Sequence, residues 1–133
     1  MSYAFLLQQA ASARKQAYCP YSGFAVGAAL LAASGQVYTG VNVESASFGA
    51  TICAERAALT AAVTAGEHVF TVLAVVAGDI PTPPCGICRQ LLSEFGDMTV
   101  LYANADLSSV QKTTLSAMLP ACFSSETMKG LTL

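Results

Sequence analysis

Cys53-Ala54-Glu55-Arg56 and Pro84-Cys85-Gly86-Ile87-Cys88-Arg89 are the two stretches around which this chain is organised. Together they contain three cysteines and one glutamate. Thiolates are favoured zinc ligands, and three protein ligands leave a fourth tetrahedral position for water. A carboxylate beside such a site moves protons between that water and a substrate. We therefore interpret the two stretches as one catalytic site with one zinc ion per subunit.

The spacing within each stretch predicts that both of them begin a helix. Cys85 and Cys88 are three residues apart, so in the first turn of a helix both sulfurs project from one face. Cys53 and Glu55 differ by only two residues and would point apart in the middle of a helix. We therefore expect Cys53 to lie at the very start of its helix, with dihedral angles that are not yet helical. The positive ends of both helices would then stabilise the anionic sulfurs.

Arg56 and Arg89 each directly follow a metal-ligand motif, although the chain has only six Lys and Arg residues. Our hypothesis is that both donate hydrogen bonds to the sulfurs. Such bonds would lower the electron density on the thiolates and restore some of the Lewis acidity of zinc.

Other interpretations of the cysteines and the single histidine stay open at this point. A Cys-x-x-Cys pair is also typical of redox proteins, but such proteins do not need a third cysteine followed by Ala-Glu. Cys19 and Cys122 are expected to be packing residues, with a fourth metal ligand as the alternative. His68 lies away from the cysteines in the sequence, and we expect it not to bind the metal. A structural zinc module, normally closed by four protein ligands, is the alternative that is not an enzyme.

The composition indicates a protein with much apolar surface and no affinity for nucleic acids. Charged residues make up 11% of the chain, against an average of ~25%, so we expect an oligomer to bury part of the surface. The net charge is −2 and the basic residues are scattered, which argues against binding a phosphate backbone. The longest apolar run, residues 24–33, is about half of the ~20 residues of a membrane span. Without a signal peptide, and with an odd number of cysteines, a cytoplasmic protein with reduced thiols is expected.

The periodicity of apolar residues predicts an α/β fold in a single domain of residues 1–133. Strands are expected at 24–33, 36–43, 70–77, 99–103 and 110–114, and helices at 3–18, 53–65, 86–95 and 116–119. This order gives a mixed five-stranded sheet with helices on both faces, a three-layer α/β/α sandwich.

The metal-ligand motifs are similar to those of the cytidine deaminase family, whose zinc site has a Pro-Cys-x-x-Cys signature. The resemblance runs from Pro20 to Phe123 and includes residues 20–24, 40–44 and 119–120. A cysteine at position 53 resembles the small homotetrameric enzymes that bind zinc through three cysteines. The resemblance implies hydrolysis of cytidine and deoxycytidine to uridine and deoxyuridine in pyrimidine salvage, with release of ammonia.

The resemblance also implies roles for residues outside the metal motifs. The Ala54 N–H would hold the pyrimidine carbonyl, Asn42 and Glu44 would bind ribose hydroxyls, and Phe24 would pack against the base. Glu55 would act as the proton carrier. From the residues alone, an ordinary core residue is the favoured interpretation of Phe24, while Asn42 and Glu44 are equally typical of a turn and a solvated charge.

A homotetramer with shared active sites is implied as well, in which Phe123 approaches the pocket of a neighbouring subunit. Phe48 stands where many relatives have tyrosine, so one hydrogen bond near the 5′ end of the substrate is in doubt, and a modest rise in KM is expected. Another small-molecule deaminase, such as one acting on the antibiotic blasticidin S, stays open as an alternative, although Glu44 favours a nucleoside.

Overall fold

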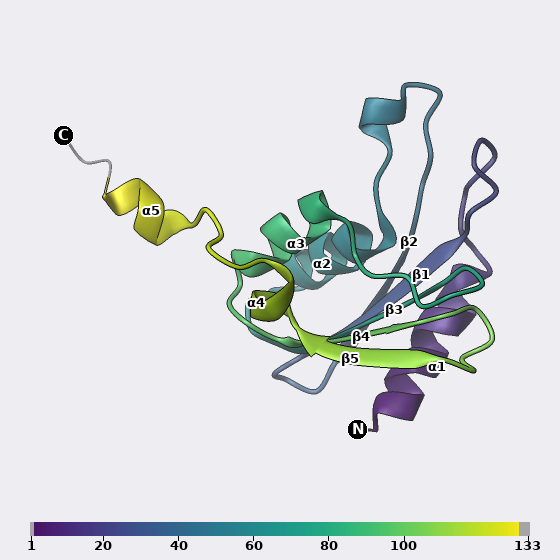
Figure 1. Cartoon of the computed structure of the whole chain (residues 1–133), viewed down its shortest axis with the longest axis horizontal. Helices are drawn as coiled ribbons and strands as arrows, with labels where there is room; N and C mark the ends of the chain where they lie inside the picture. Colours follow the sequence, from purple (N-terminus) through teal and green to yellow (C-terminus); the bar gives the residue numbers. More distant parts are fainter. Residues whose placement is uncertain (1, 131–133) are drawn as a thin grey trace.

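The computed structural model describes residues 2–130, in which five strands form one mixed sheet of order β2-β1-β3-β4-β5 (Figure 1). The β1 strand pairs antiparallel with β2 and β3, β3 pairs parallel with β4, and β4 pairs antiparallel with β5. The predicted α/β class and mixed five-stranded sheet are confirmed. The elements in chain order are α1 (Tyr3–Arg14), β1 (Val26–Ala32), β2 (Val37–Val41), η1 (Phe48–Ala50), α2 (Ala54–Thr64), β3 (Phe70–Ala77), α3 (Gly86–Ser93), β4 (Thr99–Ala103), β5 (Val110–Thr114), α4 (Leu115–Met118) and α5 (Ser125–Lys129).

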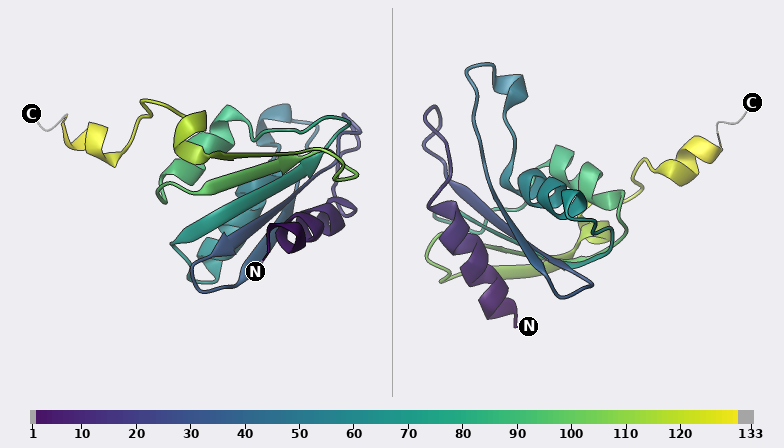
Figure 2. Two further views of the ribbon diagram at one scale, coloured as in Figure 1. Left: turned by 60° about the horizontal axis from the view of Figure 1, so that its bottom comes forward. Right: turned by 180° about the vertical axis from the view of Figure 1, so that it is seen from behind.

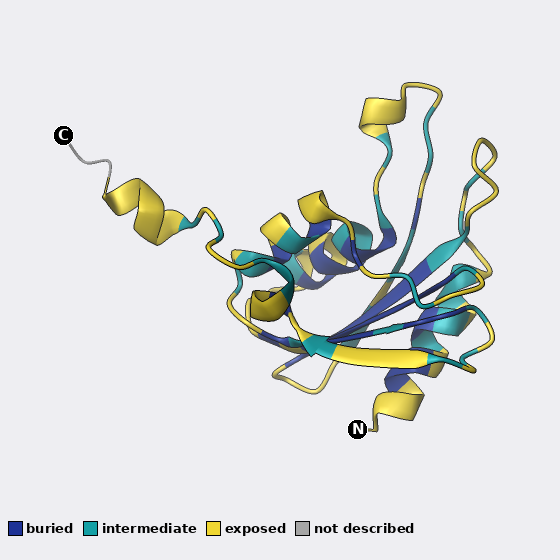
Figure 3. Cartoon of the chain, in the orientation of Figure 1, coloured by how far each residue is buried: buried dark blue, intermediate teal, exposed yellow. Residues whose placement is uncertain are grey.

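Helices cover both faces of the sheet, α1 on one face and α2 with α3 on the other (Figure 2). The central strand β3 shows why its sequence is apolar from Val72 to Ala77, after the exposed Thr71 near its start. Val72, Ala74 and Val76 pack in the cluster that includes α1, whereas Leu73 and Val75 pack in the cluster that includes α2. A strand buried on both faces needs an apolar side chain at every position. The helices α1, α2 and α3 thus bury both sides of the sheet centre (Figure 3).

The topology brings the starts of α2 and α3 together. The α2 helix packs across β1 and β2, and α3 follows β3 and leads to the parallel strand β4. The two helices contact one another and lie side by side on one face of the sheet (Figure 1). The residues that directly precede each helix therefore meet at one edge of the molecule.

The first helix ends at Arg14, earlier than the expected residue 18. Beyond it the chain forms two tighter turns, in which the N–H groups of Gln16 and Ala17 donate to Ala13 O and Arg14 O. Tyr18 then donates its N–H to Asn42 O and accepts from the N–H of Glu44. This pairing requires an extended backbone at residue 18, so a tertiary contact overrides the local helical pattern.

The helix at the C-terminal end, α5, was not expected from the sequence. Ser124 and Thr127 form a reciprocal capping box at its start, a device that satisfies two otherwise free N–H groups. The α5 segment extends away from the sheet and the other helices (Figure 1). Among residues 2–130, no helix is long and apolar enough to cross a membrane.

Gly40 permits the close contact between β2 and α2. A Cβ atom at this position would lie 2.4 Å from both Ala54 O and Ala58 N, distances that real Cβ atoms do not adopt. Any side chain here would displace the first turns of α2, which directly follow Cys53.

We predict that Gly40→Ala lowers the free energy of unfolding by about 2 kcal/mol, within the usual range for overpacking. Thermal or urea unfolding measures this change. Gly49→Ala is the matched control, because a Cβ atom at Gly49 has no neighbour within 4 Å. Its stability should stay within about 0.5 kcal/mol of the wild type, and equal stabilities of the two variants would show that the contact is not tight.

Candidate metal centre and active site

Two cysteines occupy the residue directly before a helix. Cys53 precedes α2 with φ −74° and ψ 154°, and Cys85 precedes α3 with φ −70° and ψ 169°. Both backbones are extended, and that of Cys53 is non-helical as the short spacing between Cys53 and Glu55 predicts. Neither cysteine side chain caps its helix, so the free N–H groups of both first turns face the site with their positive end.

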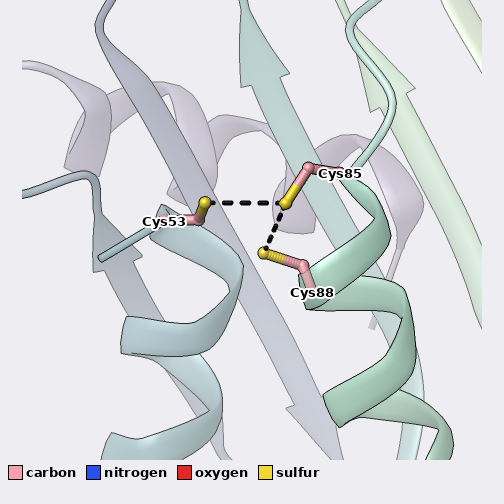
Figure 4. A group of neighbouring side chains, drawn as sticks. All are labelled: Cys53, Cys85 and Cys88. Atoms are coloured by element: carbon pink, nitrogen blue, oxygen red, sulfur yellow. Dashed lines mark hydrogen bonds between the residues drawn. The ribbon is translucent and has the colours of Figure 1, made fainter. Parts of the chain in front are cut away.

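The three sulfurs of Cys53, Cys85 and Cys88 converge between the two helix starts (Figure 4). The distance from Cys53 Sγ to Cys85 Sγ is 3.7 Å, and that from Cys85 Sγ to Cys88 Sγ is 3.4 Å. Sulfurs that bind one tetrahedral zinc ion at ~2.3 Å lie about 3.8 Å from one another. The spacing therefore fits a zinc ion, and all five cysteines of the chain are free thiols.

Among residues 2–130, this cluster contains no fourth histidine, cysteine or carboxylate ligand. Cys19, Cys122 and His68 all lie outside it. Structural zinc is normally closed by four protein ligands, whereas a catalytic ion keeps one position open. The donor set is therefore of the catalytic kind.

The thiols interact strongly with one another. The pKa of Cys53 is lowered to about 5, because the Cys88 thiol hydrogen-bonds its sulfur and Arg56 lies beside it. The pKa of Cys88 is raised, because the proton that it shares with Cys53 is held in that bond. Thiolates held this close together repel one another, since like charges repel. A dication among them supplies the missing positive charge, which is why metal binding releases these protons.

The two arginines behave differently. Arg56 Nη2 donates to Cys53 Sγ at 3.6 Å and to Thr51 O at 3.3 Å, so its position agrees with the hypothesis of a hydrogen bond to sulfur. The same hypothesis is wrong for Arg89, whose guanidinium donates to the carbonyl oxygens of Pro84 at 2.7 Å and Met118 at 2.9 Å. Carbonyl oxygens are better acceptors than sulfur. Arg89 therefore ties the segment before α3 to the end of α4.

A cleft of about 290 Å³ opens beside the cysteines. Glu55 lies in it with 4% of its surface exposed, and burial raises the pKa of its carboxyl group. The structure brings seven of the eleven predicted site residues together here, whereas Cys88, Arg56, Arg89 and Phe123 are not part of the lining. The lining consists of Ser22, Phe24, Val26, Asn42, Glu44, Thr51, Cys53, Ala54, Glu55, Val75, Thr82, Pro83 and Cys85.

The polar lining of the cleft is engaged in hydrogen bonds within the chain. Asn42 donates from Nδ2 to Phe24 O at 2.8 Å and accepts at Oδ1 from Val26 N at 2.9 Å. Glu44 accepts from the loop before Phe24. Sequence reasoning gave no role to Ser22, although it lies inside the stretch of residues 20–24 that carries the resemblance.

Two aromatic residues that were predicted to lie near the substrate are outside the cleft. Phe123 is 55% exposed on the segment between α4 and α5. Phe48 is 74% exposed, and its ring meets that of Tyr21 edge-on at 5.8 Å between centroids.

Comparison with known proteins places this arrangement in a family. The family model of the cytidine and deoxycytidylate deaminase zinc-binding region matches residues 2–104. The chain belongs to this deaminase family. Zinc is therefore the ion that the three-cysteine cluster holds, as predicted.

Individual members of the deaminase family match over nearly the whole chain. A cytidine deaminase of Sporosarcina psychrophila is 46% identical over 124 residues, which cover 91% of this chain and 90% of the relative. A cytidine deaminase of Halalkalibacterium halodurans is 44% identical over 131 residues, covering 96% and 98%. The crystal structure of cytidine deaminase from Burkholderia pseudomallei superimposes with a TM-score of 0.88 at 42% identity, covering 92% of this chain and 100% of that one. The deaminase fold is thus confirmed.

We predict that each chain binds one zinc ion and that Cys85→Ser reduces the content to below about a fifth, because thiolate ligands hold structural and catalytic zinc far better than a hydroxyl does. Elemental analysis of the purified protein measures the ratio. Cys122→Ser, outside the cluster, and Arg56→Gln, which leaves all three sulfurs in place, should both retain the metal. Loss of zinc from Cys122→Ser would show that the ligand set is wrong.

Proposed function

We propose that this protein is a zinc-dependent cytidine deaminase, which hydrolyses cytidine and deoxycytidine to uridine and deoxyuridine with release of ammonia. The observation that supports this most is the Glu55 carboxyl group, buried in the same cleft as the sulfur cluster. A redox or structural site has no need of such a group, whereas hydrolysis of an amino group requires a proton carrier. The relatives at 44–46% identity are named cytidine deaminases.

Glu55 is the proposed catalytic residue. Zinc held by the sulfurs of Cys53, Cys85 and Cys88 would supply the Lewis acidity that lowers the pKa of the attacking water towards ~7. The Glu55 carboxylate takes a proton from the attacking water and delivers it to ring N3 of the substrate, which makes C4 more electrophilic. Glu55 then takes the proton of the new C4 hydroxyl group and delivers it to the amine, so that C4 becomes a carbonyl, ammonia leaves and the carboxylate returns to its starting state. Its burial raises the pKa of its carboxyl group, which makes the protonated form easier to reach during proton transfer.

The remaining cleft residues are proposed to hold the nucleoside. Phe24 is 44% exposed, and an aromatic ring at the wall of a cleft suits packing against a flat pyrimidine. The Ala54 N–H, in the first turn of α2, is proposed to donate to the pyrimidine carbonyl. Asn42 and Glu44 are proposed to bind the sugar hydroxyls. Arg56 is proposed to tune the electron density of the Cys53 sulfur.

The charge of the cleft favours a nucleoside over a nucleotide. Within residues 2–130, the lining includes the carboxyl groups of Glu44 and Glu55 and no lysine, arginine or histidine. A phosphate on the substrate would meet negative charge without a partner. Free cytidine and deoxycytidine therefore suit the site better than their phosphates.

We predict that the wild type converts cytidine to uridine and that Glu55→Gln lowers kcat at least about 100-fold, the usual contribution of general acid–base catalysis. The loss of cytidine absorbance gives the rate, and zinc analysis should show that Glu55→Gln keeps its metal. Glu94→Gln, an exposed glutamate at the end of α3, is the control and should match the wild type.

Three other results would argue against this proposal. Turnover by Glu55→Gln within about tenfold of the wild type would remove Glu55 from the mechanism. Faster turnover of blasticidin S than of cytidine would favour the antibiotic. A zinc-loaded wild type without deaminase activity on either compound would favour the structural module.

The assembly belongs to the same proposal. We infer a homotetramer with shared active sites, in which Phe123 of one subunit approaches the cleft of another, and in which each chain acts as one domain. The five-residue helix α5 stands away from the rest of the chain, and a helix so short is not stable alone in water. A neighbouring subunit that packs against it would supply the missing contacts. We place the protein in the cytoplasm, where its thiols stay reduced.

Sedimentation velocity tests this assembly. We expect a species of about four times the 13.7 kDa mass of the chain. Phe123→Ala should lower deaminase activity, because Phe123 would then be missing from the cleft of the neighbouring subunit. A monomer with full activity would contradict both parts of the inference.

A further inference from the structure

The Glu44 carboxylate is fixed by the loop that precedes Phe24. Its Oε1 accepts from the backbone N–H groups of Tyr21 and Ser22, each at 3.0 Å, and its Oε2 accepts from the Ser22 hydroxyl. The backbone N–H of Glu44 donates to Tyr18 O at 2.9 Å. These contacts hold both ends of the residue, and the Ser22 hydroxyl is the largest cause of its lowered pKa.

Three of the four acceptor positions of this carboxylate are therefore occupied. Each carboxylate oxygen accepts about two hydrogen bonds. Oε1 already accepts two and Oε2 accepts one, so the free position belongs to Oε2, the oxygen that contacts Ser22. Both Glu44 and Ser22 line the cleft. A sugar hydroxyl that donates to Glu44 therefore binds at Oε2, beside the Ser22 hydroxyl.

The Ser22 hydroxyl is itself oriented from its other side. The Phe24 N–H donates to Ser22 Oγ at 3.0 Å. Because one lone pair of Oγ is taken in this way, the single hydrogen of the hydroxyl points to Glu44. Asn42 in turn holds the carbonyl of Phe24. The backbone of the proposed base-packing residue and the proposed sugar-binding carboxylate thus share one serine oxygen.

We propose that Ser22 is a positioning residue for the sugar of the nucleoside, whose hydroxyl fixes the Glu44 carboxylate so that its one free acceptor position meets a ribose hydroxyl. This inference rests on the proposed function of the cleft. Ser22 touches none of the reacting atoms and acts through Glu44. Its removal therefore affects substrates that carry sugar hydroxyls more than those that lack them.

Ser22→Ala tests this role with two substrates. The kcat/KM for cytidine should fall about tenfold, mainly through KM, as for the loss of a hydrogen bond to a charged group that contributes to binding. For 2′,3′-dideoxycytidine, which lacks both the 2′ and the 3′ hydroxyl, kcat/KM should fall less than about twofold. Ser22→Thr keeps the hydroxyl and should stay within about threefold of the wild type with cytidine. Equal losses on the two substrates would overturn the proposal, because a merely structural role would not depend on the sugar.

A double substitution separates Ser22 from Glu44. If the serine acts through the carboxylate, Ser22→Ala in a Glu44→Ala background should cost less than about twofold more with cytidine. A full further loss of about tenfold in that background would show that the two residues act independently and would overturn the proposal.

The chain offers a matched control in Ser34. Its hydroxyl also donates to a carboxylate, that of Glu67, at the far end of the β1–β2 hairpin and outside the cleft. Ser34→Ala should leave both kcat/KM values within about twofold. A wild type that does not deaminate cytidine contradicts the proposed function of the cleft. An active wild type with an unaffected Ser22→Ala contradicts only the role of Ser22.

Discussion

The convergence of three thiols on one point is the constraint on which the rest of the structure depends. Their sulfurs all lie within 4.8 Å of one another, a distance at which three negative charges repel strongly without a cation. Two helix N-termini lie beside them, and Arg56 donates to one of them. Each of these features adds positive potential at the same place. The sheet, in turn, holds α2 and α3 so that their starts meet.

The relative positions of the three sulfurs also depend on how residues far from the metal site pack in the sheet. The β3 strand is buried on both faces and leads directly to the segment that delivers Cys85. Gly40 allows α2 to lie close against β2, and this close packing places Cys53 opposite Cys85. A small change in either contact would move one sulfur relative to the others, and metal sites tolerate only a few tenths of an ångström.

One set of hydrogen bonds orients the part of the cleft that is proposed to bind the sugar, beside the cysteine cluster. Asn42, Ser22 and Glu44 bond to the chain around Phe24 as well as lining the cleft. A polar residue that supports the wall and faces the ligand is already oriented before the ligand arrives. Preorganisation of this kind lowers the entropy that binding has to overcome.

The sequence by itself determined the fold class, the strands β3, β4 and β5, and the three cysteines of the metal cluster, because local spacing and apolar periodicity encode them. It did not determine where α1 ends, since Tyr18 pairs with residues 42–44, which lie distant in the chain. Nor did it determine the partners of Arg89, since those carbonyls meet it only after folding. The proposed role of Ser22 could not be predicted from the sequence either, because the hydrogen-bond partners of its hydroxyl, the Glu44 carboxylate and the Phe24 N–H, are brought together only by folding. Spacing along the chain fixes which side chains share a helix face, whereas only tertiary structure decides which groups from different elements come within hydrogen-bond distance.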